Sequence, residues 1–284
     1  MYILLTKFRS IYFELFHRKT DLTNLYQVRP LDKTRRIPNQ IFQTWKSSKV
    51  DKNHSKIISR LIQNNPNWSF EFFDDSAMDL YMRDKWSREP IFEIYNSVNF
   101  GASRADIWRL CILFDRGGGY LDIDSTLNFS LDEIDPTFSE LISFEGSRVK
   151  DAFHPDLFPD LELFQNPELT NLKYLKFPEN VALNWALFFS PGHQILRIAI
   201  DEIVEKSKFI KGHVFEDIGV AVVHTTGPII FTHAIWRYLK ESPTPINQMG
   251  LDFDGLGVFK AIGRNSSYHA AGHYSMATAR AVIS

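Results

Sequence analysis

The fold is decided by the stretch Gly117-Gly118-Gly119-Tyr120-Leu121-Asp122-Ile123-Asp124. Immediately before it, residues 103–114 carry apolar side chains at helical spacing, namely Ile107, Leu110, Cys111 and Phe114. The glycine run ends this helix and allows a tight turn, because glycine adopts backbone conformations that other residues avoid. The chain then enters a buried strand over 120–122. We therefore expect a helix, a sharp turn and a strand whose end presents Asp122 and Asp124.

Strands and helices alternate on both sides of this stretch. We expect further strands at 37–45, 68–73 and 185–190, and further helices at 54–64, 191–207 and 228–240. The first two strands and the helix between them form a βαβ unit. Residues 125–180 are rich in phenylalanine, proline and acidic side chains, and favour an insertion over the sheet. The alternation predicts an α/β fold, in which ligands bind beyond the carboxyl ends of strands, where Asp122 and Asp124 would lie.

The composition is typical of one large folded domain. The chain has 284 residues, 44% of them hydrophobic, so it can bury a sizeable core. The formal net charge is -2 and no basic face is concentrated in the sequence, so we expect no nucleic-acid partner. Cys111 is the single cysteine, which excludes a disulfide within the chain and favours a reducing cytoplasm. Because Cys111 lies on the apolar stripe, we expect it to be buried and unreactive.

The N-terminal residues 1–30 are expected to form an amphipathic helical segment, followed by one domain over 31–284. The apolar stretch is too short to span a membrane because it is interrupted by charged or polar residues at Lys7, Arg9, Glu14 and His17. Its apolar residues fall at helical spacing beside basic ones, which leaves two interpretations. Residues 1–19 either contact the inner face of a membrane peripherally or pack as a helix on their own domain.

Asp122 and Asp124 form an Asp-x-Asp triplet at the expected strand end. Two carboxylates separated by one residue can face one cleft, and hard oxygen ligands suit Mg²⁺ or Mn²⁺. A metal held there would neutralise the charge that grows on a departing nucleotide diphosphate. Taken alone, however, such triplets are usually solvated loop residues, so the meaning of this one depends on its surroundings.

The stretch from Ala102 to Asp124 resembles the donor-site signature of glycosyltransferase family 32, the DXD-containing sugar transferases of the capsular polysaccharide and mannosyltransferase type. It is also similar to the large clostridial glucosylating toxins. Residues 37–45 look like the family's opening strand, and Thr226-Gly227-Pro228 looks like its later Thr-Gly-Pro turn. The resemblance implies a GT-A fold, with a Rossmann-like mixed sheet flanked by helices. It also implies a divalent metal, a nucleotide-sugar donor and retention of anomeric configuration.

The resemblance assigns roles to several polar residues. Asp124 would ligate the metal, Asp122 would contact ribose and sugar hydroxyls, and Asp106 and Arg109 would hold the donor sugar. His269 would be a further metal ligand, from a closing stretch in which a histidine precedes Gly-Ser-Trp. Without the neighbouring motif, the residues alone favour an exposed ion pair for Asp106 and Arg109, and a lone loop histidine such as His269 is more often simply exposed.

Four positions carry less defined expectations. Trp45, at the end of the first strand, either stacks on the nucleotide base or belongs to the core. Asn184 either faces donor or acceptor or is a buried structural asparagine. The chain departs from the family pattern at His273 and Tyr274, which replace the usual serine and tryptophan and leave the diphosphate contacts there undefined.

The sequence therefore predicts a retaining glycosyltransferase that uses Mn²⁺ or Mg²⁺ and moves a hexose from a UDP- or GDP-sugar. The expected acceptor is a glycan or lipid-linked saccharide in surface or capsular polysaccharide synthesis, and no protein nucleophile is needed. Two alternatives remain open. The run from Asp122 to Thr126 also fits a haloacid-dehalogenase-type phosphatase with Asp122 as nucleophile, although a triple glycine just before it is atypical. The chain is otherwise readable as a non-catalytic sugar-nucleotide binder.

Overall fold

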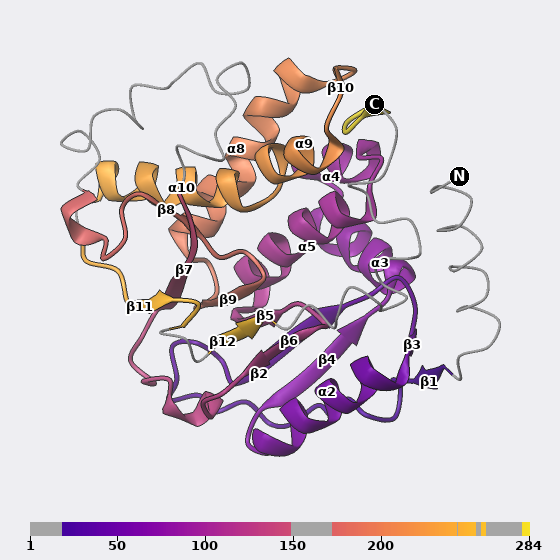
Figure 1. Cartoon of the computed structure of the whole chain (residues 1–284), viewed down its shortest axis with the longest axis vertical. Coiled ribbons are helices and arrows are strands. Elements are labelled where there is room, and N and C mark those ends of the chain that lie inside the picture. The colour runs from indigo at the N-terminus through magenta and orange to yellow at the C-terminus, as the bar shows by residue number, and fades with distance from the viewer. Residues whose placement is uncertain (1–18, 149–171, 243, 254–256, 260–279) are drawn as a thin grey trace.

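A seven-stranded mixed sheet forms the middle layer of the protein (Figure 1). The computed structural model describes residues 19–148, 172–242, 244–253, 257–259 and 280–284. The sheet order is β11 (Gln248–Leu251), β7 (Glu140–Arg148), β9 (Ala186–Phe189), β5 (Gly118–Leu121), β2 (Gln40–Thr44) and β4 (Ser69–Phe73). The strand β8 (Asn180–Ala182) pairs with β7. The predicted α/β architecture, with a mixed sheet flanked by helices, is confirmed.

The expected βαβ unit is present. β2 and β4 are parallel and are joined through α2 (Lys52–Asn64), which begins at the N-cap Asp51. β5 lies parallel to β2 on its other side, so β4, β2 and β5 end at the same edge of the sheet. β9 is antiparallel to β5 and closes this half of the sheet.

The central strands are buried on both faces. Phe42 of β2 packs into the larger core cluster, whereas its neighbour Ile41 packs into the cluster on the opposite face. Tyr120 and Leu121 of β5 divide in the same way, because successive side chains of a strand point to opposite faces. Burial on both faces extends to polar side chains in β2, where Gln40, Gln43 and Thr44 are also buried.

Six helices enclose the larger core cluster in the described part of the chain (Figure 1). They are α3 (Asp75–Trp86), α4 (Pro90–Ser97), α5 (Gly101–Arg116), α8 (Gln194–Ile210), α9 (Ile218–Thr225) and α10 (Pro228–Glu241). The expected helices at 103–114, 191–207 and 228–240 correspond to α5, α8 and α10. No helix was predicted from the sequence at α3, α4 or α9. Cys111, on α5, is fully buried as expected, and burial raises the pKa of its thiol.

The glycine run makes the sharp turn that the sequence predicts. Gly117 has a φ of 63° and Gly118 a φ of 100°, both in the region that favours glycine. At Gly119 the restriction is space: a Cβ atom there would lie 2.6 Å from Cδ1 of Ile41 and 2.7 Å from Cδ1 of Phe188. The missing side chain at Gly119 therefore leaves room for Ile41 of β2 and Phe188 of β9.

One expectation about the middle of the chain is wrong. Residues 125–180 were expected to cover the sheet as an insertion, but β7 lies inside it, between β11 and β9. The strand begins with an acidic residue, Glu140, which in the sequence resembles an exposed side chain. In the structure Glu140 is buried, because it accepts hydrogen bonds from Ser139 and from the backbone N–H of Asn247 and pairs with His193. Residues 149–171 lie outside the described part.

Short elements complete the described chain. They are β1 (Thr20–Asp21), β3 (Lys49–Val50), β6 (Ser125–Leu127), β10 (Val214–Phe215), β12 (Gly257–Phe259), β13 (Arg280–Ala281) and the 3₁₀ turns η1 (Leu131–Glu133) and η4 (Leu172–Tyr174). β1 lies within the segment that was expected to be helical up to residue 30, and Leu22 after it is fully buried. Residues 1–18 lie outside the described part.

Within the described residues, one stretch is long and apolar enough to cross a membrane by length and composition, Ile218–Glu241. It consists of α9 and α10, which are separated at Thr226 and Gly227. Of the most apolar 18 residues in this stretch, 78% are buried inside the protein, so their apolar side chains belong to its core.

Candidate functional site

The Asp-x-Asp turn is fixed by backbone hydrogen bonds at the end of β5. Asp122 follows the last residue of the strand, as predicted, and its N–H donates to the carbonyl of Trp185 at 2.9 Å. The carbonyl of Asp122 accepts from the N–H of Ser125 at 2.9 Å and from Nε2 of Gln43 at 3.3 Å. The turn is therefore tied to β2 and to the residue before β9.

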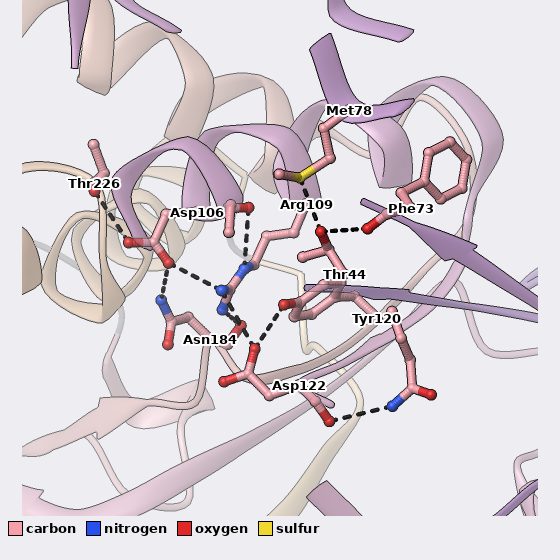
Figure 2. Close-up of polar contacts among 11 residues, drawn as sticks. Thr44, Phe73, Met78, Asp106, Arg109, Tyr120, Asp122, Asn184 and Thr226 are labelled. Atoms are coloured by element: carbon pink, nitrogen blue, oxygen red, sulfur yellow. Dashed lines mark hydrogen bonds and ion pairs between the residues drawn. The ribbon is translucent and has the colours of Figure 1, made fainter. Parts of the chain in front are cut away.

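The Asp122 carboxylate is held by two neighbours (Figure 2). The hydroxyl of Tyr120 donates to its Oδ1 at 2.6 Å, and Nη2 of Arg109 lies 3.4 Å from the same oxygen. The Arg109 guanidinium also lies 4.3 Å from the centre of the Tyr120 ring. With 29% of its side chain exposed, Asp122 can still meet a ligand from the open side.

Arg109 links two carboxylates and a carbonyl. Its Nη2 lies 3.3 Å from Oδ1 of Asp106, one turn earlier on α5, and its Nη1 donates to the carbonyl of Asn184 at 2.6 Å. Only 8% of each side chain of the Asp106 and Arg109 pair is exposed. The alternative of an exposed ion pair is therefore wrong, because the residues around Asn184 and Thr226 cover this face of α5.

Asp106 is buried, and both of its carboxylate oxygens accept hydrogen bonds. Oδ2 accepts from Oγ1 of Thr226 at 3.0 Å, and Oδ1 accepts from Nδ2 of Asn184 at 3.2 Å (Figure 2). Burial raises the pKa of the Asp106 carboxyl to about 6, and the negative charge of Asp122 adds to the rise. Arg109 and the hydrogen bonds from Thr226 and Asn184 act in the opposite direction. The structure thus brings together Asp106, Arg109, Asp122 and Asn184, four of the predicted site residues.

Asp124 is nearly buried, with 5% of its surface exposed. Burial is the main cause that raises the pKa of its carboxyl to about 6, and the negative charge of Asp122 adds to the rise. His54 acts in the opposite direction and lowers this pKa. Among the described residues, no lysine or arginine forms an ion pair with Asp124. A buried carboxylate beside a second one, without a cationic side chain, is chemically suited to a hard divalent cation.

The described residues contain no group of three histidine, cysteine, aspartate or glutamate side chains that could hold a metal by themselves. His269, the predicted further ligand, lies outside the described part of the chain, as does His273. Of the two predicted metal ligands, Asp124 and His269, the described part of the chain therefore contains Asp124.

Trp45 directly follows β2, and its N–H donates to the carbonyl of Phe73 at 3.2 Å. Its half-buried ring packs against a small apolar cluster that includes Ile58 and Ile123. Both interpretations of Trp45 therefore keep some support: part of the ring belongs to the core and part remains exposed.

Three residues of the site were not assigned roles from the sequence. Tyr120 and Thr226 bond directly to Asp122 and Asp106, and His54 influences the pKa of Asp124. His54 is buried, with Nδ1 2.9 Å from Oδ2 of Asp51. The sequence offers a signal for two of them: Tyr120 stands two residues before Asp122, and Thr226 begins the Thr-Gly-Pro turn of the family resemblance.

A family model described as "Glycosyltransferase sugar-binding region containing DXD motif" matches residues 51–139. An initiation-specific alpha-1,6-mannosyltransferase of Candida albicans is 26% identical over 222 residues, which cover 74% of this chain and 55% of that protein. Inositol phosphoceramide mannosyltransferase 3 of Schizosaccharomyces pombe is 30% identical over 99 residues, which cover 34% of this chain and 27% of that protein.

Among solved structures, the PaToxG glycosyltransferase aligns with a TM-score of 0.49 and 17% identity, covering 85% of this chain and 77% of that one. The chain spans about half the length of the Candida albicans relative and a smaller share of the Schizosaccharomyces pombe one. The matched region includes α5, the glycine turn and both aspartates of the triplet. The resemblance found in the sequence is thereby confirmed over residues 51–139, which match the DXD-containing sugar-binding region of glycosyltransferases.

Proposed function

We propose that this protein is a metal-dependent retaining glycosyltransferase that moves a hexose from a nucleotide sugar to a saccharide acceptor. The observation that carries the proposal is the state of Asp124: a nearly buried carboxylate beside Asp122, without a lysine or arginine partner among the described residues. Together with the family match over this region, that arrangement supports a site that is completed by a cation.

Asp124 would hold Mn²⁺ or Mg²⁺, and His269 is the proposed further ligand. When bound, the metal would neutralise the charge that develops on the leaving nucleotide diphosphate. Asp122 is kept in place by Tyr120 and Arg109 through Oδ1, which leaves its other oxygen for ribose or sugar hydroxyls. No protein nucleophile is required in this scheme.

The donor sugar would lie against Arg109 and Asp106, beside Asn184. The nucleotide base would stack on the exposed part of Trp45, which stands at the same edge of the sheet as Asp122.

The names of the two relatives point to mannose as the first donor sugar to test, and GDP-mannose is one of the donors that the sequence leaves open. The proposed acceptor is a glycan or lipid-linked saccharide in surface or capsular polysaccharide synthesis. A cytoplasmic location, with residues 1–19 against the inner face of a membrane, belongs to the same proposal and is tested by deleting those residues.

The two other functions fit the site less well. A phosphatase nucleophile at Asp122 would have to attack with a carboxylate that already accepts from Tyr120 and pairs with Arg109, both of which lower its nucleophilicity. The family match also concerns sugar transfer rather than phosphate hydrolysis. A non-catalytic binder would need no preserved carboxylate pair, yet both Asp122 and Asp124 are present.

The decisive experiment is a panel of UDP- and GDP-sugars, scored for hydrolysis or transfer with Mn²⁺ and again with excess chelator. We expect one donor to be consumed only with the metal, and Asp124→Asn to lose this activity while remaining folded. Asp84→Asn, which removes an exposed charge on α3, is the matched control and should retain it. Release of phosphate from a phosphomonoester would favour the phosphatase, and donor binding without turnover would favour the binder.

A further inference from the structure

We propose that Thr226 is a positioning residue of the donor site, which fixes Asp106 and through it the orientation of Arg109 toward Asp122. The inference rests on the proposed function, because Arg109 and Asp122 are the groups placed there against the donor. Its source, however, is the hydrogen-bond geometry of four buried or half-buried side chains (Figure 2).

Thr226 stands at a fixed point of the fold. It is the C-cap of α9, 2% exposed, and is followed by Gly227 and the first turn of α10. Its N–H donates to the carbonyl of Val222 at 3.2 Å. A Cβ atom at Gly227 would lie 2.9 Å from Cα of Val223, so the junction of the two helices is closely packed. The Thr226 hydroxyl is therefore presented by rigid backbone.

The hydroxyl has a clear preference between its two possible acceptors. Oγ1 lies 3.0 Å from Oδ2 of Asp106 and 3.5 Å from the carbonyl of Val222, and a hydroxyl has one proton to donate. The shorter contact is also to a carboxylate, which makes the stronger kind of hydrogen bond. The Thr226 hydroxyl therefore donates its hydrogen bond to Asp106.

The orientation of Asp106 decides that of Arg109. With Oδ2 bound by Thr226 and Oδ1 bound by Asn184, the carboxylate cannot turn, and Oδ1 faces Nη2 of Arg109 at 3.3 Å. The same Nη2 lies 3.4 Å from Oδ1 of Asp122, so it lies between the two carboxylates. Without Thr226, Asp106 gains freedom to turn, and Arg109 loses the partner that balances Asp122.

The chain offers a matched control in the preceding residue. Thr225 is also 2% exposed, and its Oγ1 has no hydrogen-bond partner among the described residues. Thr225→Val and Thr226→Val therefore make the same chemical change at neighbouring buried positions, but only the second removes a hydrogen bond to Asp106. Thr226→Ser keeps the hydroxyl and provides the conservative rescue.

The test measures donor binding by calorimetry, steady-state turnover, and thermal unfolding for wild type and the three variants. We expect Thr226→Val to weaken donor binding and to raise KM at least about tenfold, the scale of one hydrogen bond to a charged group. Thr226→Ser should lie within about twofold of wild type and Thr225→Val should be unchanged. A tenfold loss that Thr226→Ser does not rescue, or one that Thr225→Val shares, would assign the effect to packing and overturn the proposal.

A crystal structure of Thr226→Val provides a readout that needs no activity. We expect the Asp106 carboxylate to turn and the distance from Arg109 to Asp122 to change from its present 3.4 Å. An unchanged Arg109 in that structure would overturn the positioning role. If wild type binds no nucleotide sugar, the proposed function fails, while this structural comparison still decides the role of Thr226.

Discussion

Replacing Asp124 by asparagine should stabilise the metal-free protein and abolish its response to manganese. Asparagine has nearly the same shape as aspartate and keeps an acceptor oxygen, but it carries no charge and is a poor ligand for a hard cation. The side chain is 5% exposed, so the cost of its ionisation in the folded state is not relieved by water. The substitution therefore removes both the free-energy cost of burying the Asp124 charge and the metal binding proposed for it, and the two effects are measured separately.

The magnitude follows from the pKa of Asp124, which burial and then the charge of Asp122 raise from 3.8 to about 6. Since one pKa unit corresponds to 1.36 kcal/mol, holding Asp124 ionised costs the folded state about 3 kcal/mol at neutral pH. Below pH 3.8 the carboxyl is protonated in both states and the cost is absent. It grows as the pH rises from 3.8 to 6, where only the unfolded state ionises, and is complete above 6.

The assay is urea unfolding of wild type and Asp124→Asn with chelator, at pH 7.5 and near pH 4. We expect the variant to be more stable by up to about 3 kcal/mol at pH 7.5, and the difference to fall toward zero near pH 4. Added Mn²⁺ should raise the unfolding temperature of wild type and leave that of the variant unchanged. Equal stability at pH 7.5 in chelator would refute the account of the buried charge, and equal stabilisation of both proteins by Mn²⁺ would refute the metal role.

Three further predictions concern α5 and its turn. Arg109→Gln leaves the Asp106 and Asp122 carboxylates without their shared cation. Donor turnover should fall by orders of magnitude, and the free energy of unfolding in urea should fall by about 3–5 kcal/mol. Turnover at the wild-type rate would contradict the role assigned to Arg109. Gly119→Ala should cost about 1–3 kcal/mol in thermal unfolding, because its Cβ would lie 2.6 Å from Ile41, whereas Gly101→Ala meets nothing within 4 Å and should be neutral. The Cys111 thiol should resist a thiol reagent until the protein unfolds, and rapid labelling of native protein would contradict its burial.

The elements that the sequence predicts well are those whose signal is local. The helix that became α5, the glycine turn and β5 follow one another within 21 residues, counted from Gly101 to Leu121, and each has its own pattern. β7 was missed because its signal is not local: Glu140 at its start is tolerated in the interior only because His193 and Asn247 approach it from other parts of the chain. A buried acid with distant partners resembles an exposed one in the sequence.

The same limit explains why the residues alone favour an exposed pair at Asp106 and Arg109. The two residues lie on a face of α5 away from its apolar stripe, and a polar face of a helix normally meets water. The face is covered by Asn184 and Thr226, which lie 78 and 120 residues from Asp106 in the sequence, and no periodicity within α5 can indicate such a cover.

The cover also gives the pair a role that an exposed pair would not have. In water, an ion pair at this spacing contributes little and its side chains move freely, so it could not orient a third group. Under Asn184 and Thr226 the carboxylate of Asp106 has one orientation available, and Arg109 must be shared between Asp106 and Asp122. The burial of Asp106 is costly for the fold, as its raised pKa indicates, and what it provides is a fixed cation beside the Asp-x-Asp turn. A site that binds a diphosphate and a sugar requires such fixed charge, because groups that are oriented beforehand need no reorganisation when charge develops on the leaving group.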